Sequence, residues 1–295
     1  MPEQSRPWVS IRSTKLTAEI DPQGAQLSAL KEGTLDLLWD GNPALWAGRA
    51  PILFPIVGAL VGGSYRLGKE TYHLSRHGFA RGKAFSVVNT TPSSALFRLS
   101  ADDSTRQVYP FQFELDVNFA LADASLSVTT TVRNKGDADM PASVGYHPGF
   151  RWPLPYGHSR AAHFIEFELD EPEPVRRIGT DGLLTASPQS TPVEGRRLVL
   201  ADSLFKDDVL IFDRLKSRSV TYGSDGGPRL RVSFADAPYL GVWTKPGAPF
   251  ICIEPWHGIT DPQGFTGDFK DKPGVFVLAA GESLSTTMGI ALLEA

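Results

Sequence analysis

The sequence has few of the features that mark several large classes of protein. It contains one cysteine, Cys252, so no internal disulfide can form and nothing in the chain depends on an oxidising compartment. No run of about 18 apolar residues occurs, which argues against a transmembrane helix. Residues 1–13 contain no apolar stretch long enough for a signal peptide. We therefore expect a cytoplasmic protein.

The chain also lacks a strong charge of either sign. It carries 29 Lys and Arg against 33 Asp and Glu, a net charge of −4. The basic residues are scattered and not clustered, which argues against a nucleic-acid interface and against a polybasic membrane surface. We expect neither nucleic acid nor membrane as a partner.

Sequence signatures of metal, nucleotide and covalent serine chemistry are missing as well. There is no HExxH, no paired-cysteine zinc pattern, no glycine-rich phosphate or dinucleotide loop, and no GxSxG elbow. The histidines have no metal-ligand spacing, and Cys252 lies in an apolar run, where it is a poor candidate nucleophile. The sequence therefore predicts no metal and no cofactor.

What the chain does contain is short strand-like segments, many of which alternate apolar with polar residues. They are Ser86–Asn89, Ala95–Ser100, Phe111–Leu121, Ser125–Arg133, Phe164–Leu169, Val209–Phe212, Ser219–Gly223, Leu230–Phe234 and Gly274–Leu278. The turn at 122–124 predicts a hairpin between two of them. Helical periodicity is scarce, and 28 glycines and 23 prolines interrupt the chain. We expect one all-β antiparallel domain over residues 1–295, with a long excursion at 170–197.

Three segments depart from this alternation and concentrate polar, chemically useful side chains. They are residues 75–81 (SRHGFAR), 145–150 (GYHPGF) and 253–261 (IEPWHGITD). Their central residues His77, His147 and Glu254 are separated by 70 and 107 positions. A site built from them requires the tertiary fold to bring strand ends together.

His147 and Glu254 are the strongest candidates for acid/base chemistry. Histidine is the usual general acid or base near neutral pH, and Pro148 restricts the backbone of His147. A carboxylate directly after the buried run 250–253 is partly desolvated, which raises its pKa toward the range useful for a base. Trp256 offers a flat face for a sugar ring. Each residue alone also fits a structural role, as a packed histidine or a paired glutamate.

Arginines near His77 suggest a group that binds hydroxyls or an anion. Arg76 and Arg81 lie near His77 in the sequence, and Arg49 lies in the segment Gly48–Pro51. A guanidinium donates to sugar hydroxyls or grips a phosphate with two parallel hydrogen bonds. A structural salt-bridge cluster is the competing interpretation.

Together these segments resemble the aldose 1-epimerase (galactose mutarotase-like) superfamily, and most closely its small bacterial LacX-type subgroup. The resemblance covers nearly the whole chain. It rests on the order and spacing of Leu16–Ile20, Gly24–Leu27, Leu38–Trp39, Arg49–Pro55, His77–Arg81, Gly145–Pro148 and Glu254–Trp256. It implies a β-supersandwich of large antiparallel sheets with an open cleft for a monosaccharide. Relatives often carry an aromatic residue where this chain has Gly149, so the local shape of the cleft differs.

The resemblance also implies roles for particular residues. His147 would protonate the ring oxygen of the sugar, and Glu254 would take the proton of the C1 hydroxyl. His77 and Arg49 would hold hydroxyls, and a family aspartate corresponds to Asp208, or to Asp207 beside it. Such a reaction needs one acid and one base and predicts a bell-shaped pH dependence, with the histidine at least partly protonated and the glutamate ionised at pH 7.

Three alternatives remain open at this point. A hexose-6-phosphate 1-epimerase of the same fold would use the arginines to bind phosphate. A non-catalytic carbohydrate-binding protein would keep the cleft without turnover. A glycoside hydrolase or lyase would need a second carboxylate facing Glu254, for which Asp208 and Asp261 are available. The sequence does not name the sugar or the oligomeric state.

Overall fold

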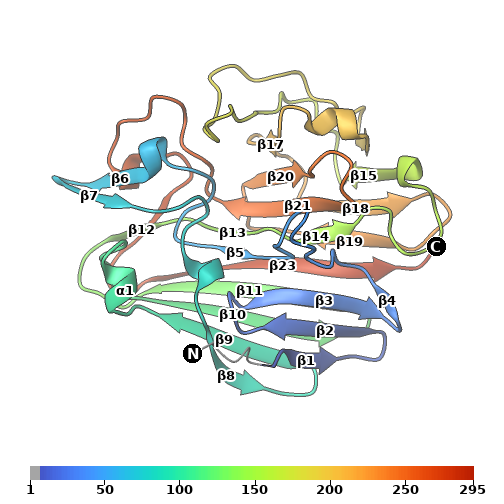
Figure 1. The fold of residues 1–295 in the computed structure, drawn as a ribbon, viewed down its shortest axis with the longest axis horizontal. Helices are drawn as coiled ribbons and strands as arrows, with labels where there is room; N and C mark the ends of the chain where they lie inside the picture. The colour runs from blue at the N-terminus through green and yellow to red at the C-terminus, as the bar shows by residue number, and fades with distance from the viewer. Residues whose placement is uncertain (1–6) are drawn as a thin grey trace.

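The computed structural model describes residues 7–295, and residues 1–6 of the N-terminal stretch considered above lie outside the described residues. The described chain is built almost entirely of antiparallel strands, which confirms the all-β prediction (Figure 1). Its only α-helix is the single turn α1, Asp103–Arg106, and five short 3-10 turns occur besides it. Among residues 7–295, no helix is both long and apolar enough to span a membrane.

The strands form two large sheets and one smaller one. The first large sheet has the order β16 (Arg197–Val199), β15 (His163–Phe167), β18 (Ser219–Ser224), β19 (Arg229–Ser233), β23 (Ser283–Leu293), β11 (Ser125–Asn134), β10 (Phe113–Ala122), β9 (Ser94–Ser100), β8 (Ser86–Thr90). The second has the order β17 (Leu210–Phe212), β20 (Tyr239–Trp243), β21 (Phe250–His257), β13 (Val144–Tyr146), β5 (Ile52–Leu53), with β14 (Gly149–Arg151) also on β21. The smaller sheet joins β1 (Val9–Arg12), β2 (Leu16–Asp21), β3 (Gln26–Glu32) and β4 (Leu35–Asp36).

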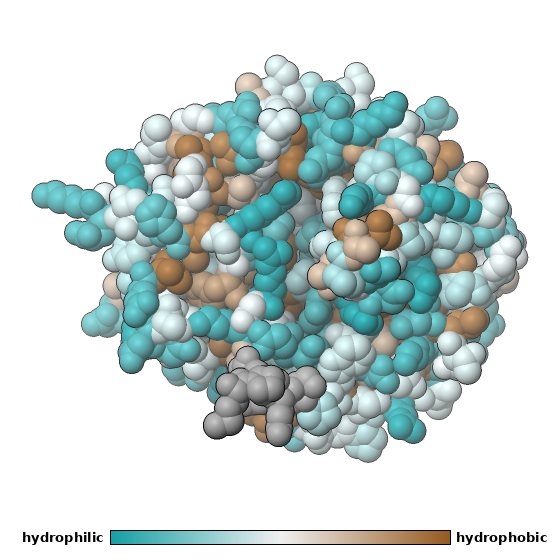
Figure 2. Space-filling view, viewed as in Figure 1, coloured by the Kyte–Doolittle hydropathy of each residue, from teal (hydrophilic) through white to brown (hydrophobic). Residues whose placement is uncertain are grey.

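The remaining strands form two isolated pairs. β6 (Ser64–Leu67) pairs with β7 (Glu70–His73) at the left edge of Figure 1, and β12 (Met140–Ala142) pairs with β22 (Phe276–Leu278). Figure 2 shows a face that is mostly hydrophilic, with hydrophobic residues scattered in small groups. The apolar side chains are therefore concentrated between the layers, as expected for stacked sheets.

The predicted hairpin shows how alternation places side chains in the core. β10 and β11 pair in register from Phe113 opposite Asn134 to Ala122 opposite Ser125, so the turn is Asp123–Ala124. Asp123 has φ 48°, a conformation that Asp tolerates in tight turns. Every second residue from Phe113 to Leu121 is buried. The strand predicted from Phe111 begins two residues later.

Two contacts show that the second sheet packs on the first. The phenol oxygen of Tyr146 on β13 lies 2.8 Å from the Thr286 carbonyl oxygen of β23 and accepts a hydrogen bond from Thr130 N–H of β11. The Phe54 ring, next to β5, lies 5.1 Å from that of Phe113 on β10. Tyr146 immediately precedes His147, so this packing fixes the backbone that carries the histidine.

The longest strand, β23, was not predicted from the sequence, whereas the structure confirms the long excursion. β23 spans 11 residues with Leu284, Thr286, Met288, Ile290 and Leu292 turned inward, an alternation that the sequence does contain. Between β15 and β16 the chain runs from residue 168 to 196 without a strand, as predicted. Isolated bridges such as Arg176 with Ile211 hold this segment against the end of the second sheet.

Candidate active site

Strand register brings His147 and Glu254 face to face. β13 and β14 both pair with β21, Gly145 opposite Trp256 and Gly149 opposite Cys252. The same register across the gap between β13 and β14 sets His147 opposite Glu254. Residues directly opposite each other on antiparallel strands have Cβ atoms about 5 Å apart. Accordingly His147 Nε2 lies 3.3 Å from Glu254 Oε2.

Two prolines lie at this point, where the ladder between β21 and the strands β13 and β14 is interrupted. Pro148 and Pro255 have no N–H to donate, so β13 ends at Tyr146 and β14 begins only at Gly149. The backbone is held by two other bonds, from His147 N–H to the Pro51 carbonyl (3.2 Å) and from Ile253 N–H to the Pro148 carbonyl (3.3 Å). The prolines that flank both residues in sequence therefore mark a fixed local geometry.

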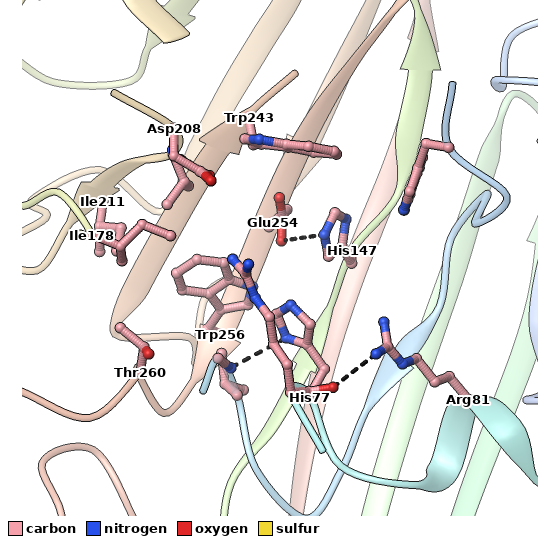
Figure 3. A pocket seen from close by; sticks show the side chains of 15 residues that line it. His77, Arg81, His147, Ile178, Asp208, Ile211, Trp243, Glu254, Trp256 and Thr260 are labelled. Atoms are coloured by element: carbon pink, nitrogen blue, oxygen red, sulfur yellow. Dashed lines mark hydrogen bonds and ion pairs between the residues drawn. The ribbon is translucent and has the colours of Figure 1, made fainter. Parts of the chain in front are cut away.

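A cavity of about 250 Å³ lies over this pair. Figure 3 shows His147 and Glu254 pointing toward each other at its base, with Trp243 and Trp256 on either side of Glu254. Seven residues singled out from the sequence line it, namely Arg76, His77, Arg81, His147, Asp208, Glu254 and Trp256. The tertiary structure thus collects the three predicted segments in one place.

Glycines on the neighbouring strands make room for the Trp256 indole. A Cβ at Gly241 of β20 would stand 2.5 Å from the Trp256 ring, and one at Gly145 of β13 would stand 2.8 Å from it. The indole therefore lies across the backbone of both strands, beside Glu254. Trp256 lines the cavity and is 5% exposed, and the use of its flat face by a sugar stays a prediction.

Trp46 supplies the aromatic ring that the sequence lacks at position 149. A Cβ at Gly149 would stand 2.9 Å from the Trp46 ring, so the glycine is what admits the indole. Trp46 stacks on the His147 imidazole, with ring centroids 5.0 Å apart and planes at 27°. Trp243 meets the same imidazole edge-on at 5.8 Å. The departure at Gly149 is compensated by a residue from a distant loop.

His77 is held as a neutral hydrogen-bond donor. The ring Nδ1 of His77 accepts from Gly58 N–H at 3.1 Å, and the backbone N–H of His77 donates to the Gly58 carbonyl at 2.8 Å. Burial, together with the nearby His147, lowers the pKa of His77 well below its usual range. Because Nδ1 is an acceptor, the ring proton resides on Nε2 and remains available to a ligand. His77 has φ 68°, and Gly78 with φ 71° follows it.

Gly78 explains why this segment must contain a glycine. A Cβ there would stand 2.2 Å from the Phe54 carbonyl oxygen, a distance no side chain allows. That carbonyl accepts from the N–H groups of Phe79 and Ala80. The segment 77–81 is therefore held against Phe54, the residue that follows β5, and the orientation of His77 follows.

Arg76 and Arg81 place positive charge at the cavity. Both line it, and Arg81 donates to the Arg76 carbonyl at 2.8 Å. Within residues 7–295, neither guanidinium forms an ion pair with a carboxylate. Burial and the charge of Arg76 lower the pKa of Arg81. Two unpaired cations face the space where a ligand would bind.

The structure distinguishes Asp208 from Asp207 and places the Arg49 side chain outside the cavity. Asp208 lines the cavity, whereas Asp207 lies only on an adjoining depression. The Arg49 guanidinium donates to the Ser28 carbonyl at 2.7 Å and does not line the cavity. Its carbonyl accepts from Gly149 N–H at 2.7 Å. Arg49 therefore supports the site through its backbone and not, as predicted, through its side chain.

Burial controls the protonation of the catalytic candidates. It lowers the pKa of His147 to about 3 and raises the pKa of Glu254 well above its usual range. Burial therefore favours neutral His147 with protonated Glu254 over the charged pair. This differs from the expected charged pair, because the sequence could not show how deeply both groups are buried.

Several lining residues escaped sequence reasoning. Trp46, Val57, Ile178, Ile211, Trp243 and Thr260 all line the cavity. Trp243 ends a short apolar run, Tyr239–Trp243, that could have been identified as a strand. Ile178 comes from the excursion at 170–197, and Trp46 from a loop, and neither carries a pattern that would mark it. Apolar walls around a few convergent polar groups are typical of small-molecule sites.

Comparison with known proteins agrees with this geometry. A sequence model of the family described as aldose 1-epimerase matches residues 7–289. The chain is 34% identical over 278 residues to the plasmid-encoded protein LacX of Lactococcus lactis, covering 90% of this chain and 93% of that one. A galactose mutarotase related enzyme from Lactobacillus acidophilus superposes with a TM-score of 0.89 at 33% identity, over 97% of each chain.

A second solved structure gives the same result. A galactose mutarotase-like protein from Lactobacillus casei superposes with a TM-score of 0.90 at 31% identity, covering 97% of this chain and all of that one. Fold and overall sequence thus agree over nearly the full length. The chain belongs to the aldose 1-epimerase family.

Proposed function

We propose that the protein interconverts the α and β anomers of an aldose. The observation that carries this proposal is the cross-strand pair His147–Glu254, 3.3 Å apart at the base of a cavity of about 250 Å³. That volume lies below the range of about 300–1,000 Å³ typical of sites for drug-sized ligands, which suits a single sugar ring.

Ring opening requires the pair in its charged form. Glu254 takes the proton from the C1 hydroxyl while His147 gives a proton to the ring oxygen. The bond between C1 and the ring oxygen breaks, and C1 becomes an aldehyde carbon. The pair is left as neutral His147 and protonated Glu254, the form that burial favours. The protein environment therefore stabilises the open-chain stage.

Ring closure runs the same transfers backward. After rotation about the C1–C2 bond, His147 takes the proton from the C5 hydroxyl and Glu254 returns a proton to the aldehyde oxygen. The opposite anomer forms, and no proton is gained or lost overall. His77 Nε2–H and Asp208 are placed to hold hydroxyls, and Trp256 to support the ring.

The test is anomer exchange measured by NMR with glucose and galactose. Glu254→Gln and His147→Gln each remove one proton-transfer group, for which we expect losses of roughly 10²- to 10⁴-fold. His257→Gln is the matched control, since His257 follows on the same strand but does not line the cavity. Binding without any acceleration over the spontaneous rate would place the protein in the non-catalytic, sugar-binding class.

One observation favours a second candidate, a 1-epimerase of sugar phosphates. The unpaired guanidinium groups of Arg76 and Arg81 at the cavity suit bidentate binding of a phosphate. Glucose 6-phosphate would then be preferred over glucose, and inorganic phosphate would compete with it. Arg81→Gln should abolish that preference and leave turnover of glucose much less affected. Equal turnover of both sugars would exclude this candidate.

A further inference from the structure

Cys252 lies beside the catalytic pair although proton transfer has no use for it. It precedes Glu254 by two residues on β21, so both side chains project from the same side of the strand. Its Sγ, a His147 ring nitrogen and a Glu254 carboxylate oxygen all lie within 4.8 Å of one another. All three residues are buried. Three metal-binding atoms of different kinds thus converge on one point.

Two polar atoms of this group have unsatisfied hydrogen-bonding capacity. Within the chain from residue 7 onward, neither His147 Nδ1 nor Glu254 Oε2 has a hydrogen-bond partner. The close approach of His147 Nε2 to Oε2 is not aligned as a hydrogen bond. His147 is 8% exposed and Glu254 1%. Buried polar atoms left unpaired cost free energy, so a cation that binds Glu254 Oε2 removes part of that cost.

The donor set identifies the class of ligand. Thiolate, imidazole and carboxylate together are typical ligands of Zn²⁺, with bonds of about 2.0–2.3 Å. Such bonds place tetrahedral ligand atoms roughly 3.6 Å apart, and the nitrogen and oxygen already lie 3.3 Å apart. Cys252 Sγ lies at most 4.8 Å from the nitrogen and the oxygen, so it must move toward them by no more than about 1 Å. The cavity leaves the fourth position open.

We propose that His147, Glu254 and Cys252 form an inhibitory binding site for Zn²⁺ and similar divalent cations. The inhibitory effect rests on the proposed epimerase function, because the metal occupies the lone pairs that proton transfer uses. Glu254 and Cys252 each release one proton when the cation binds, and their two negative charges balance its charge. Binding is therefore tighter at higher pH.

Cobalt(II) chloride tests the site without reference to catalysis. We expect one equivalent of Co²⁺ to give a thiolate-to-cobalt charge-transfer band in the near ultraviolet and strong visible bands, both abolished by excess Zn²⁺. Cys252→Ser and Cys252→Ala should each lose the charge-transfer band, whereas His257→Gln should keep it. Two variants are used so that one remains if the other does not fold, as judged by circular dichroism. A wild-type protein without the band would refute the site.

Anomer exchange tests the inhibition. Zn²⁺ should slow exchange by the wild type, and a chelator should restore it. In the Cys252 variants the inhibitory concentration should rise by more than about tenfold, since even outer-shell partners of a metal contribute 10- to 100-fold to affinity. Equal inhibition of wild type and variants would overturn the role of Cys252. If no sugar is turned over, the proposed function fails, while the cobalt spectrum still decides the metal site.

Discussion

Replacing His147 tests how burial controls the protonation of the site. Burial lowers the pKa of His147 to about 3 in the folded protein, against 6.5 for an unperturbed histidine. As the pH falls below 6.5, the unfolded chain takes up a proton at this residue and the folded chain does not. The unfolded state is therefore favoured, and stability is lost progressively between pH 6.5 and 3. Above pH 6.5 neither state binds the proton and the term vanishes.

The size of the effect follows from the two pKa values. One pKa unit corresponds to about 1.4 kcal/mol, so the full loss below pH 3 is about 5 kcal/mol and the loss at pH 5 is about 2 kcal/mol. His147→Gln has no group that titrates there. Relative to this variant, the wild type should lose about 2 kcal/mol of unfolding free energy between pH 7 and pH 5.

Urea denaturation followed by tryptophan fluorescence measures this difference at pH 7, 6 and 5. Because both proteins share every other titrating group, those contributions cancel in the comparison. His73→Gln, at an exposed histidine on β7, is the control and should change the pH dependence little. If the difference between wild type and His147→Gln stays constant from pH 7 to pH 5, His147 is protonated in the folded state and the reasoning is refuted.

Three further predictions address the rest of the site. Glu254→Gln should stabilise the protein increasingly as the pH rises above 4.5, because the folded wild type retains a proton at Glu254 that its unfolded chain releases. Urea denaturation midpoints of wild type and variant that differ by the same amount at every pH would contradict this. Gly241→Ala should raise KM for the sugar by displacing Trp256, whereas Gly82→Ala, whose Cβ meets nothing within 4 Å, should not; equal KM values would disprove the role of the glycine. Lys272→Met should cost about 3–5 kcal/mol in urea denaturation, because it leaves Asp261 charged and unpaired at 3% exposure, and a loss below about 1 kcal/mol would argue against this.

The pH dependence of activity follows from the same buried pair. The form with one proton shared by His147 and Glu254 exists from about pH 3 up to the raised pKa of Glu254. The expected bell-shaped profile of kcat/KM is therefore broad, with no decline between pH 7 and pH 5. A loss of activity with an apparent pKa near 6.5 would show that His147 titrates as an exposed histidine does.

The sequence by itself determined the all-β class, several strands and the candidate site residues. Alternation in 113–121 and 125–133 predicted β10 and β11 because a two-residue period needs only local information. The residue types of His147 and Glu254, each followed by a proline, predicted acid/base chemistry. Asp208 could not be separated from Asp207, since adjacent residues in a loop carry no periodic signal.

Tertiary structure alone decided which of these side chains meet and in what state of charge. The register that sets His147 opposite Glu254 depends on pairing between residues more than 100 positions apart. Such distant contacts also place the Trp46 ring against Gly149 and the Arg49 guanidinium at the Ser28 carbonyl. They bring Cys252 close to His147 and Glu254 as well. Protonation depends on burial, which is a property of the packed sheets and not of the residues themselves.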